Sequence, residues 1–252
     1  MAHPLIRRDL QPLALWRHFP ARPCVSCGLR SCAGALCPLC RETLRLSAQR
    51  MRCPRCALAL PPLGLLSCPD CAAGQVALQA AVAAFDYEHP GDMLVHGLKI
   101  LHQLELVPVL ADLMVAQWQA HGPGLDKHAW IIPVPARRRA LRERGFSPSA
   151  LLAHQVARRL FVRMCPVVVR WNREGAGVQK RLGRRARRAA MRDAFVLSAR
   201  LDGRDVLLVD DVLTTGATLD ALARTCRLAG ARSVCALVAA RAPWRPVSSL
   251  SF

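Results

Sequence analysis

The sequence contains no apolar stretch long enough to cross a membrane. A transmembrane helix needs about 20 consecutive apolar residues, and every apolar run in the 252-residue chain is shorter than that. Charged residues also interrupt Met1–Phe19, which therefore lacks the continuous apolar core of a secretory signal. We expect a cytoplasmic protein without a membrane span, whose thiols are reduced.

Aromatic residues and lysines are both scarce. The chain has one tyrosine, six phenylalanines and five tryptophans, and only 3 of its 36 basic residues are lysines. Proteins that bind single-stranded nucleic acid usually combine positive charge with aromatic side chains on which bases stack. The low aromatic content therefore counts against single-strand binding, whereas the net charge of +19 favours a polyanionic partner.

Most of the positive charge lies in one stretch, Arg137–Arg192. It has 17 basic and 2 acidic residues, a net charge of +15, and its only aromatic residues are Phe146, Phe161 and Trp171. A charge of this size attracts DNA or RNA. A solvated basic face, enlarged by a coding bias toward arginine, accounts for the same composition, so the sequence leaves both interpretations open.

Two common glycine-rich phosphate-binding motifs are absent. The sequence contains neither G-x-x-x-x-G-K-S/T nor G-x-G-x-x-G, which argues against a P-loop nucleotidase and against a dinucleotide-binding domain. Val206–Thr218 has a different phosphate-binding pattern, VLLVDDVLTTGAT. It predicts a strand, an acidic pair, a turn and the beginning of a helix.

Each part of Val206–Thr218 suits a phosphorylated sugar. The apolar run Val206–Val209 is typical of a parallel strand covered on both faces. Asp210 and Asp211 are predicted at the carboxyl end of this strand, where open α/β sheets bind ligands and where carboxylates can accept hydroxyl protons. The following residues supply hydroxyl groups and backbone N–H groups at the amino end of a helix, which favours a phosphate. These phosphate-binding candidates are Thr214, Thr215, Gly216, Ala217 and Thr218. An ordinary turn with a helix cap would also use such residues, but it would not require all thirteen in this order.

Apolar patterns typical of strands and helices alternate along the rest of the chain. Strands are predicted at Ala77–Tyr87, Ala129–Val134, Val167–Val169, Asp205–Val209 and Ser233–Ala239. Helices are predicted at Leu104–Ala120, Ser147–Phe161 and Thr215–Ala229, the second capped by Ser147 and begun by Pro148. This alternation predicts an α/β fold with a doubly wound, mostly parallel sheet.

Nine of the twelve cysteines lie between Cys24 and Cys71, and eight of them form Cys-x-x-Cys pairs. The pairs are Cys24/Cys27, Cys37/Cys40, Cys53/Cys56 and Cys68/Cys71. Two such pairs complete a tetrahedral zinc site. Sequential pairing predicts one structural zinc on the first two pairs and another on the last two, but the spacing also leaves crossed pairing open. Cys32 is left outside both sites, and Cys165, Cys226 and Cys235 are expected to be small core residues.

The cysteine distribution predicts two domains. Residues 20–75 would form a small zinc-binding head, which has few large apolar residues and would need metal in order to fold. Residues 77–245 would form the α/β domain, since about 175 residues suffice for a core of their own.

Val206–Thr218 resembles the phosphoribosyl-pyrophosphate motif of type I phosphoribosyltransferases. The whole chain resembles the ComF branch of that superfamily, the competence protein F or GntX-like proteins, in which a double zinc ribbon precedes the transferase-like domain. The resemblance implies that Asp210 and Asp211 contact ribose hydroxyls and that Thr214–Thr218 hold the 5′-phosphate. It also implies phosphoribosyl pyrophosphate, or a nucleotide-like ligand, with Mg²⁺.

Four basic residues are candidates for the pyrophosphate end of such a ligand. Arginine side chains bind diphosphate oxygens through two parallel hydrogen bonds, and Pro133–Phe146 contains five arginines. We nominate Arg137, Arg142 and Arg144, and the resemblance adds Lys99. Gln179–Phe195 resembles the mobile loop of the family, although Ala190 replaces the usual asparagine.

Two functions remain open from the sequence. The first is an enzyme that transfers a phosphoribosyl group with the help of Mg²⁺. The second is a non-catalytic competence factor of the same fold that handles single-stranded DNA during DNA uptake, alongside a helicase or recombination proteins. No segment reads as a pocket for a particular base, so the acceptor is not identified.

Overall fold

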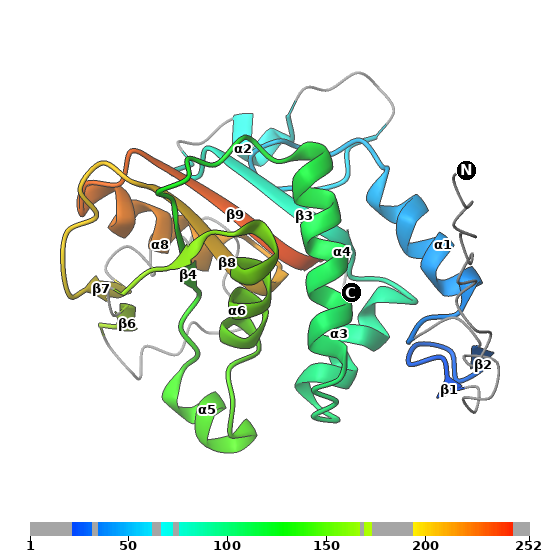
Figure 1. Ribbon diagram of the computed structural model, residues 1–252. Coiled ribbons are helices and arrows are strands. Elements are labelled where there is room, and N and C mark those ends of the chain that lie inside the picture. Colours follow the sequence, from blue (N-terminus) through cyan, green and yellow to red (C-terminus); the bar gives the residue numbers. More distant parts are fainter. Residues whose placement is uncertain are drawn as a thin grey trace, which may run out of the picture.

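A five-stranded parallel sheet forms the centre of the molecule. The computed structural model describes residues 22–31, 35–61, 67–72, 76–166, 169–172 and 194–243. The strand order is β3-β9-β8-β4-β5, and every neighbouring pair is parallel (Figure 1). The strands are β3 (Ala80–Asp86), β4 (Trp130–Pro133), β5 (Arg163–Met164), β8 (Asp205–Leu213) and β9 (Ser233–Arg241). The predicted mostly parallel α/β sheet is confirmed.

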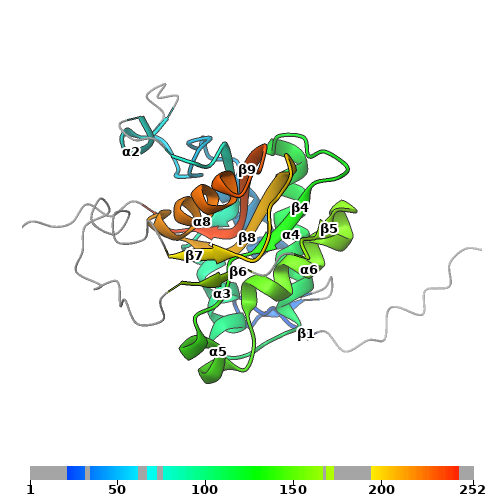
Figure 2. The same ribbon diagram turned by 90° about the vertical axis from the view of Figure 1, so that its left-hand side faces the viewer.

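Helices cover both faces of this sheet. The helices are α3 (Gly91–Lys99), α4 (Leu106–His121), α5 (Arg138–Arg144), α6 (Pro148–Leu160) and α8 (Ala217–Leu228). Figure 2 shows α8 on one face and α4 and α6 on the other. Ser147 caps α6 as predicted, because its hydroxyl accepts a hydrogen bond from the Ala150 N–H, and Pro148 begins the helix.

The apolar run in β8 is continuous because both faces of the strand are buried. Leu207 and Val209 belong to the core under α4 and α6, whereas Val206 and Leu208 belong to the core under α8. All four side chains are fully buried. Because successive side chains of a strand point to opposite faces of the sheet, they are buried alternately in the two cores.

Three predicted elements differ from those observed. β8 continues to Leu213 and β9 to Arg241, so both strands are longer than predicted. Of the predicted strand Val167–Val169, only Val169 lies within the described residues. It begins β6 (Val169–Trp171), which pairs antiparallel with β7 (Phe195–Leu197) in a separate two-stranded ribbon rather than joining the main sheet.

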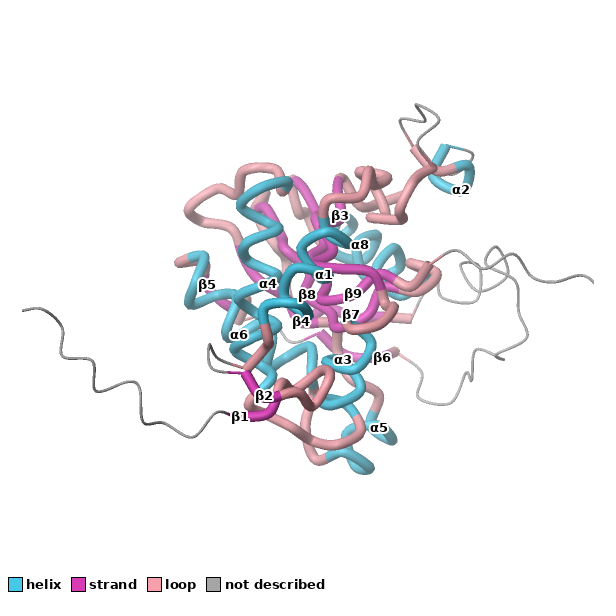
Figure 3. Tube along the Cα trace, turned by 90° about the vertical axis from the view of Figure 1, so that its right-hand side faces the viewer, coloured by secondary structure: helices cyan, strands magenta, loops and turns pink. Residues whose placement is uncertain are grey.

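The cysteine-rich head packs directly on the sheet. Its elements are β1 (Arg22–Pro23), β2 (Arg30–Ser31), α1 (Pro38–Ala48) and α2 (Pro69–Ala72). Cys40 and Leu44 of α1 are buried in the same core as Leu94 and Leu110. Figures 1 and 3 show that α2 lies well apart from α1 and the β1–β2 pair. The division into residues 20–75 and 77–245 remains a prediction, and the two parts are in close contact.

The buried carboxylate of Asp86, at the end of β3, holds the segment between α1 and the third cysteine pair. It accepts hydrogen bonds from Ser47 (3.2 Å), Arg50 (3.0 Å) and Arg52 (2.7 Å), and its backbone N–H donates to the Ser47 hydroxyl. This cluster therefore ties residues 47–52 to the sheet. Among the described helices, none is long and apolar enough to cross a membrane.

Candidate functional site

The acidic pair lies inside β8, where the strand has lost one neighbour. β4 pairs with β8 only as far as Val209, whereas β9 stays paired with it to Leu213. The prediction that Asp210 and Asp211 follow the end of the strand was therefore wrong in detail. They lie where β8 is still paired with β9 but no longer with β4.

Asp210 is held by a residue that was not selected from the sequence. The Ser149 hydroxyl, in the first turn of α6, donates to Asp210 Oδ1 at 2.7 Å, and the backbone N–H of Asp211 donates to the same oxygen at 2.9 Å. Burial raises the pKa of Asp210, and the charge of Asp211 raises it further, to about 7. The Ser149 hydrogen bond opposes this rise because it stabilises the carboxylate.

Lys99 lies at this acidic pair. Its Nζ is 2.8 Å from Asp211 Oδ1, so the last residue of α3 forms an ion pair with the centre of the motif. Gly97 permits this position, because a Cβ there would lie 2.5 Å from the Gln103 side chain and 2.7 Å from Leu106. The end of α3 can therefore approach the start of α4 closely. The structure brings together the lysine and the aspartates that were selected separately.

The turn after β8 leads directly into α8. Gly216 has a φ of 78°, in the left-handed region that favours glycine, and it occupies the N-cap position. The hydroxyl of Thr215 accepts a hydrogen bond from the Ala217 N–H at 3.4 Å. Since glycine has no side chain to cap the helix, the amino end of α8 can offer its N–H groups to an anion.

The three nominated arginines lie around α5, farther from the acidic pair. Arg137 stacks over the Trp171 ring, 4.1 Å from its centre, whereas Arg142 is exposed and Arg144 half-buried. Within the described residues, no hydrogen bond or ion pair connects any of these arginines to Asp210 or Asp211. Figures 1 and 2 show α5 and α3 at the same end of the molecule.

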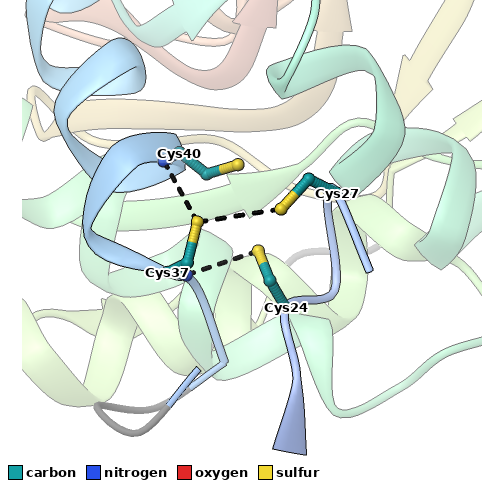
Figure 4. A group of neighbouring side chains, drawn as sticks. All are labelled: Cys24, Cys27, Cys37 and Cys40. Carbon is teal, nitrogen blue, oxygen red and sulfur yellow. Dashed lines mark hydrogen bonds between the residues drawn. The ribbon is translucent and has the colours of Figure 1, made fainter. Parts of the chain in front are cut away.

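The first two Cys-x-x-Cys pairs form one cluster. The sulfurs of Cys24, Cys27, Cys37 and Cys40 all lie within 4.8 Å of one another, and Cys27 Sγ is 3.7 Å from Cys37 Sγ (Figure 4). A tetrahedral zinc with Zn–S bonds of about 2.3 Å would separate its sulfurs by about 3.8 Å. Burial raises the pKa of Cys24, but N–H groups of Cys27 and Cys37 outweigh it and lower the pKa to about 6. The first cluster is therefore compatible with zinc.

The second cluster repeats this arrangement. The sulfurs of Cys53, Cys56, Cys68 and Cys71 also lie within 4.8 Å of one another, and Cys56 Sγ is 3.6 Å from Cys68 Sγ. A hydrogen bond from the Cys71 thiol lowers the pKa of Cys56 to about 5, and the same contact raises the pKa of Cys71. Sequential pairing is therefore observed, and the crossed pairing that the spacing left open is not.

Several predictions concern residues outside the described part of the chain. They include Cys32 and all of Gln179–Phe195 except its last two residues. Much of the basic stretch Arg137–Arg192 also lies there. Cys226 and Cys235 are buried core residues as expected, and Cys165 is half-buried.

The parallel sheet with an acidic pair and a Thr–Gly turn before α8 defines a phosphoribosyltransferase-like protein. Residues 147–250 match the family described as the phosphoribosyl transferase domain. Among solved structures, TT1426 from Thermus thermophilus matches with a TM-score of 0.33 and 20% identity, covering 57% of this chain and 86% of that chain.

Comparison with curated sequences gives the particular family. The DNA utilization protein YhgH of Escherichia coli O157:H7 is 30% identical over 201 residues, which cover 79% of this chain and 87% of that protein. Competence protein F of Haemophilus influenzae is 27% identical over 172 residues, which cover 66% and 75%. The chain belongs to the ComF-like family of phosphoribosyltransferase-related proteins, and its two four-cysteine clusters fit the double zinc ribbon of that family.

Proposed function

We propose that the protein binds phosphoribosyl pyrophosphate, or another compound carrying ribose 5-phosphate, at the turn between β8 and α8. The supporting observation is the assembly of Lys99, Ser149 and the acidic pair beside this turn. These groups come from three elements that are distant in sequence. An ordinary structural turn has no need of a lysine and two carboxylates at its edge.

The site divides between the two ends of such a ligand. Asp210 and Asp211 would accept hydrogen bonds from the ribose hydroxyls, and the N–H groups and hydroxyls of Thr214–Thr218 would bind the 5′-phosphate. Lys99 is close enough to Asp211 to bind an anionic oxygen of the same ligand. Arg137, Arg142 and Arg144 are proposed for the pyrophosphate end, because α5 follows β4 at the open edge of β8.

The residues present also fit Mg²⁺, which prefers oxygen ligands and commonly binds through a carboxylate together with substrate phosphates. Asp210 and Asp211 supply carboxylate oxygens at the proposed ribose position. When bound with the diphosphate, the ion would offset the negative charge that develops on the leaving pyrophosphate.

We propose transfer of the phosphoribosyl group to an acceptor as the reaction. Transfer needs no nucleophilic side chain from the protein. The protein would contribute by holding the ribose, phosphate and diphosphate in one orientation.

A binding titration tests this function. The zinc-loaded protein is titrated calorimetrically with phosphoribosyl pyrophosphate and Mg²⁺, in parallel with the double variant Asp210→Asn/Asp211→Asn. Because a hydrogen bond to a charged group contributes about 1.5–3 kcal/mol, we expect the double variant to bind at least about 100-fold more weakly. Asp112→Asn, which removes a surface carboxylate paired with Arg159, should bind normally. Absence of binding by the parent protein would refute the proposal.

A DNA-handling role is the second candidate, supported by the arginines around Trp171. Arg138, Arg170 and Trp171 line a hollow of about 370 Å³, and Arg137 stacks over the Trp171 ring. The charges of these arginines can bind a nucleic-acid backbone. The Trp171 ring already packs against Arg137 and Phe195, so its role would be to hold Arg137 in place. Single-stranded DNA affinity should then fall steeply with salt, and Trp171→Ala should weaken it further. A flat salt response would count against this role, and against the expected helicase or recombination partners.

We also propose that zinc occupies both four-cysteine clusters. The spacing of the sulfurs in both clusters supports this proposal. Elemental analysis of protein purified under reducing conditions should find about two zinc ions per chain. The cytoplasm remains the expected compartment, because zinc binding requires reduced thiols.

A further inference from the structure

Arg241 connects the second cysteine cluster to Thr214–Thr218, the turn that is proposed to bind phosphate and is called the ligand turn below. It is the last residue of β9 and is almost completely buried, with 2% of its surface exposed. Its Nε donates to the Cys56 carbonyl at 2.8 Å. Its Nη1 donates to the carbonyls of Leu213 at 2.9 Å, Thr214 at 2.6 Å and Ala242 at 2.6 Å. One guanidinium thus binds backbone groups from two segments more than 150 residues apart in sequence.

Both segments contribute to making this burial favourable. A buried cation is costly unless its donors find acceptors. The acceptor for Nε is the Cys56 carbonyl, and acceptors for Nη1 are the carbonyls of Leu213 and Thr214 at the beginning of the ligand turn. A lysine at position 241 could not do the same, because its single ammonium group lacks the spread of donors that a guanidinium has.

The contacts with Leu213 and Thr214 also orient the turn. A trans peptide is planar, so its C=O and N–H point in opposite directions. Holding the carbonyls of Leu213 and Thr214 against Arg241 therefore directs the N–H groups of Thr214 and Thr215 away from it. These N–H groups belong to the turn that is proposed to bind phosphate.

The contact with Cys56 depends on the second cluster. Cys56 lies in the knuckle Cys53–Ala57, and the N–H groups of Cys56 and Ala57 both donate to the Cys53 carbonyl. The Pro54 carbonyl accepts from Ala81 of β3, which sets this knuckle against the sheet. A metal ion on the four sulfurs would fix the knuckle, and with it the carbonyl that receives Arg241.

We propose that Arg241 is a positioning residue through which the second cysteine cluster and the ligand turn stabilise each other. Metal in the second cluster favours the turn conformation that binds ligand, and ligand at the turn strengthens metal binding at the second cluster but not at the first. The identity of the ligand rests on the proposed function, whereas the connection through Arg241 does not. Such coupling is reciprocal, so either direction can be measured.

The first experiment measures zinc affinity in the full-length, zinc-loaded protein. Zinc is titrated against a chromogenic chelator with and without ribose 5-phosphate, and alkylation of the freed thiols identifies which cluster has lost its ion. Coupling between sites typically changes affinity about 5- to 150-fold. We expect ribose 5-phosphate to tighten the second cluster at least about fivefold and to leave the first unchanged.

Arg241→Lys should abolish this ligand effect, since lysine cannot bind both segments. Arg159→Lys is the matched control, because Arg159 also donates to backbone carbonyls but touches neither the clusters nor the turn. The control should keep the parent behaviour. If ribose 5-phosphate binds the parent protein and strengthens both clusters equally or neither, the proposal is refuted without any variant.

The second experiment needs no ligand. Amide hydrogen exchange of the zinc-loaded protein should be about tenfold faster in Arg241→Lys at Asp220 and Ala242, whose N–H groups donate to the Gly216 and Leu213 carbonyls of the turn. The reason is that charge-assisted hydrogen bonds from Arg241 hold that turn. Exchange at residues 152–156 of α6 should not change. If Arg241 only supported overall stability, exchange there would become faster as well. If the parent binds no ribose 5-phosphate but this local change occurs, the proposed function fails and the Arg241 connection stands. Unchanged exchange at Asp220 and Ala242 would overturn the connection.

Discussion

The two four-cysteine clusters have the same ligands and spacing, but the fold uses them differently. Cys24, Cys37 and Cys40 belong to the same buried core as α3, α4 and α6, and Ser26 donates to the Pro90 carbonyl at the start of α3. Cys53, Cys68 and Cys71 form a small apolar group of their own. The first cluster is therefore part of the main core, whereas the second is a satellite that is joined to the α/β domain through the buried Ala57 and through polar contacts.

Because of this difference, we expect the first cluster to stabilise the fold and the second to affect the proposed ligand site. Loss of the first cluster would open the core that supports α3, the helix carrying Lys99. Loss of the second would leave that core closed but would release the Cys56 carbonyl from Arg241. Two clusters with the same ligands are thus expected to support different things: the first supports the main core, and the second supports the contact with Arg241. Four measurements can test this difference.

The largest effect is expected from Cys40→Ser in the first cluster. Zinc binding to a structural site contributes about 10 kcal/mol or more, which is comparable to the whole stability of a typical domain. We expect the melting temperature to fall by at least about 10 °C, because Cys40 lies within the main core. Cys71→Ser should cause a much smaller fall, with limited proteolysis confined to residues 53–72. Equal global destabilisation by both variants would remove the distinction between the clusters.

The next largest effect is expected at Asp86, which anchors the segment between the clusters. Asp86→Asn removes a buried charge that holds Arg52, a residue only 12% exposed, and breaking a buried pair costs about 3–5 kcal/mol. Since 1 kcal/mol corresponds to about 2–4 °C in a protein of this size, we expect a melting temperature lower by about 6–20 °C. Both clusters should still bind zinc. Glu42→Gln, which breaks an exposed pair with Arg45, should change the melting temperature little.

The contrast between local and distant contacts also explains what the sequence could predict. The strand, acidic pair, turn and helix of Val206–Thr218 are contiguous, so one pattern contained them all. Short spacings likewise indicated the four Cys-x-x-Cys pairs, although they left open which pairs share a site. Lys99 was selected by resemblance to a family, and only the structure places it 2.8 Å from Asp211.

Contacts between distant segments were not predictable in this way. Ser149 is 61 residues from Asp210, and Arg241 is 185 residues from Cys56. Nothing in the residue types near either position specifies these partners, because the pairing depends on which strand lies next to which. The position of Arg241 directly after an apolar strand could nevertheless have indicated a buried charge. Such a charge requires several hydrogen-bond acceptors. The end of β8 was misplaced for a related reason, as β9 extends the pairing beyond the last apolar residue of the run.

The pH dependence of ligand binding gives a further test. The pKa of Asp210 is raised to about 7, so the free protein carries this carboxyl largely protonated at pH 6 and largely ionised at pH 8. If ribose hydroxyls require the ionised form, affinity should rise about tenfold between these values. Strengthening of zinc binding by ligand should follow the same curve at the second cluster and be absent at the first. In Asp210→Asn, the pH dependence of ligand affinity that comes from the protein should disappear. Any pH dependence that comes from ionisation of the ligand phosphate should remain.

The smallest effect distinguishes the clusters through two comparable glycines. Gly216, in the ligand turn, has a φ of 78°, and Gly28, beside the first cluster, has a φ of 73°. A Cβ at Gly216 would only touch Leu213 at 3.6 Å, and a Cβ at Gly28 would meet nothing within 4 Å. Replacement by alanine should therefore cost only the backbone strain of the left-handed region, about 1–2 kcal/mol, at either position. We expect Gly28→Ala and Gly216→Ala to lower the melting temperature by a similar few degrees. Only Gly216→Ala should weaken binding of ribose 5-phosphate, and only this variant should reduce the effect of that ligand on zinc affinity at the second cluster. A comparable loss of ligand affinity in Gly28→Ala would show that the first cluster is coupled to the turn as well, by a path other than Arg241.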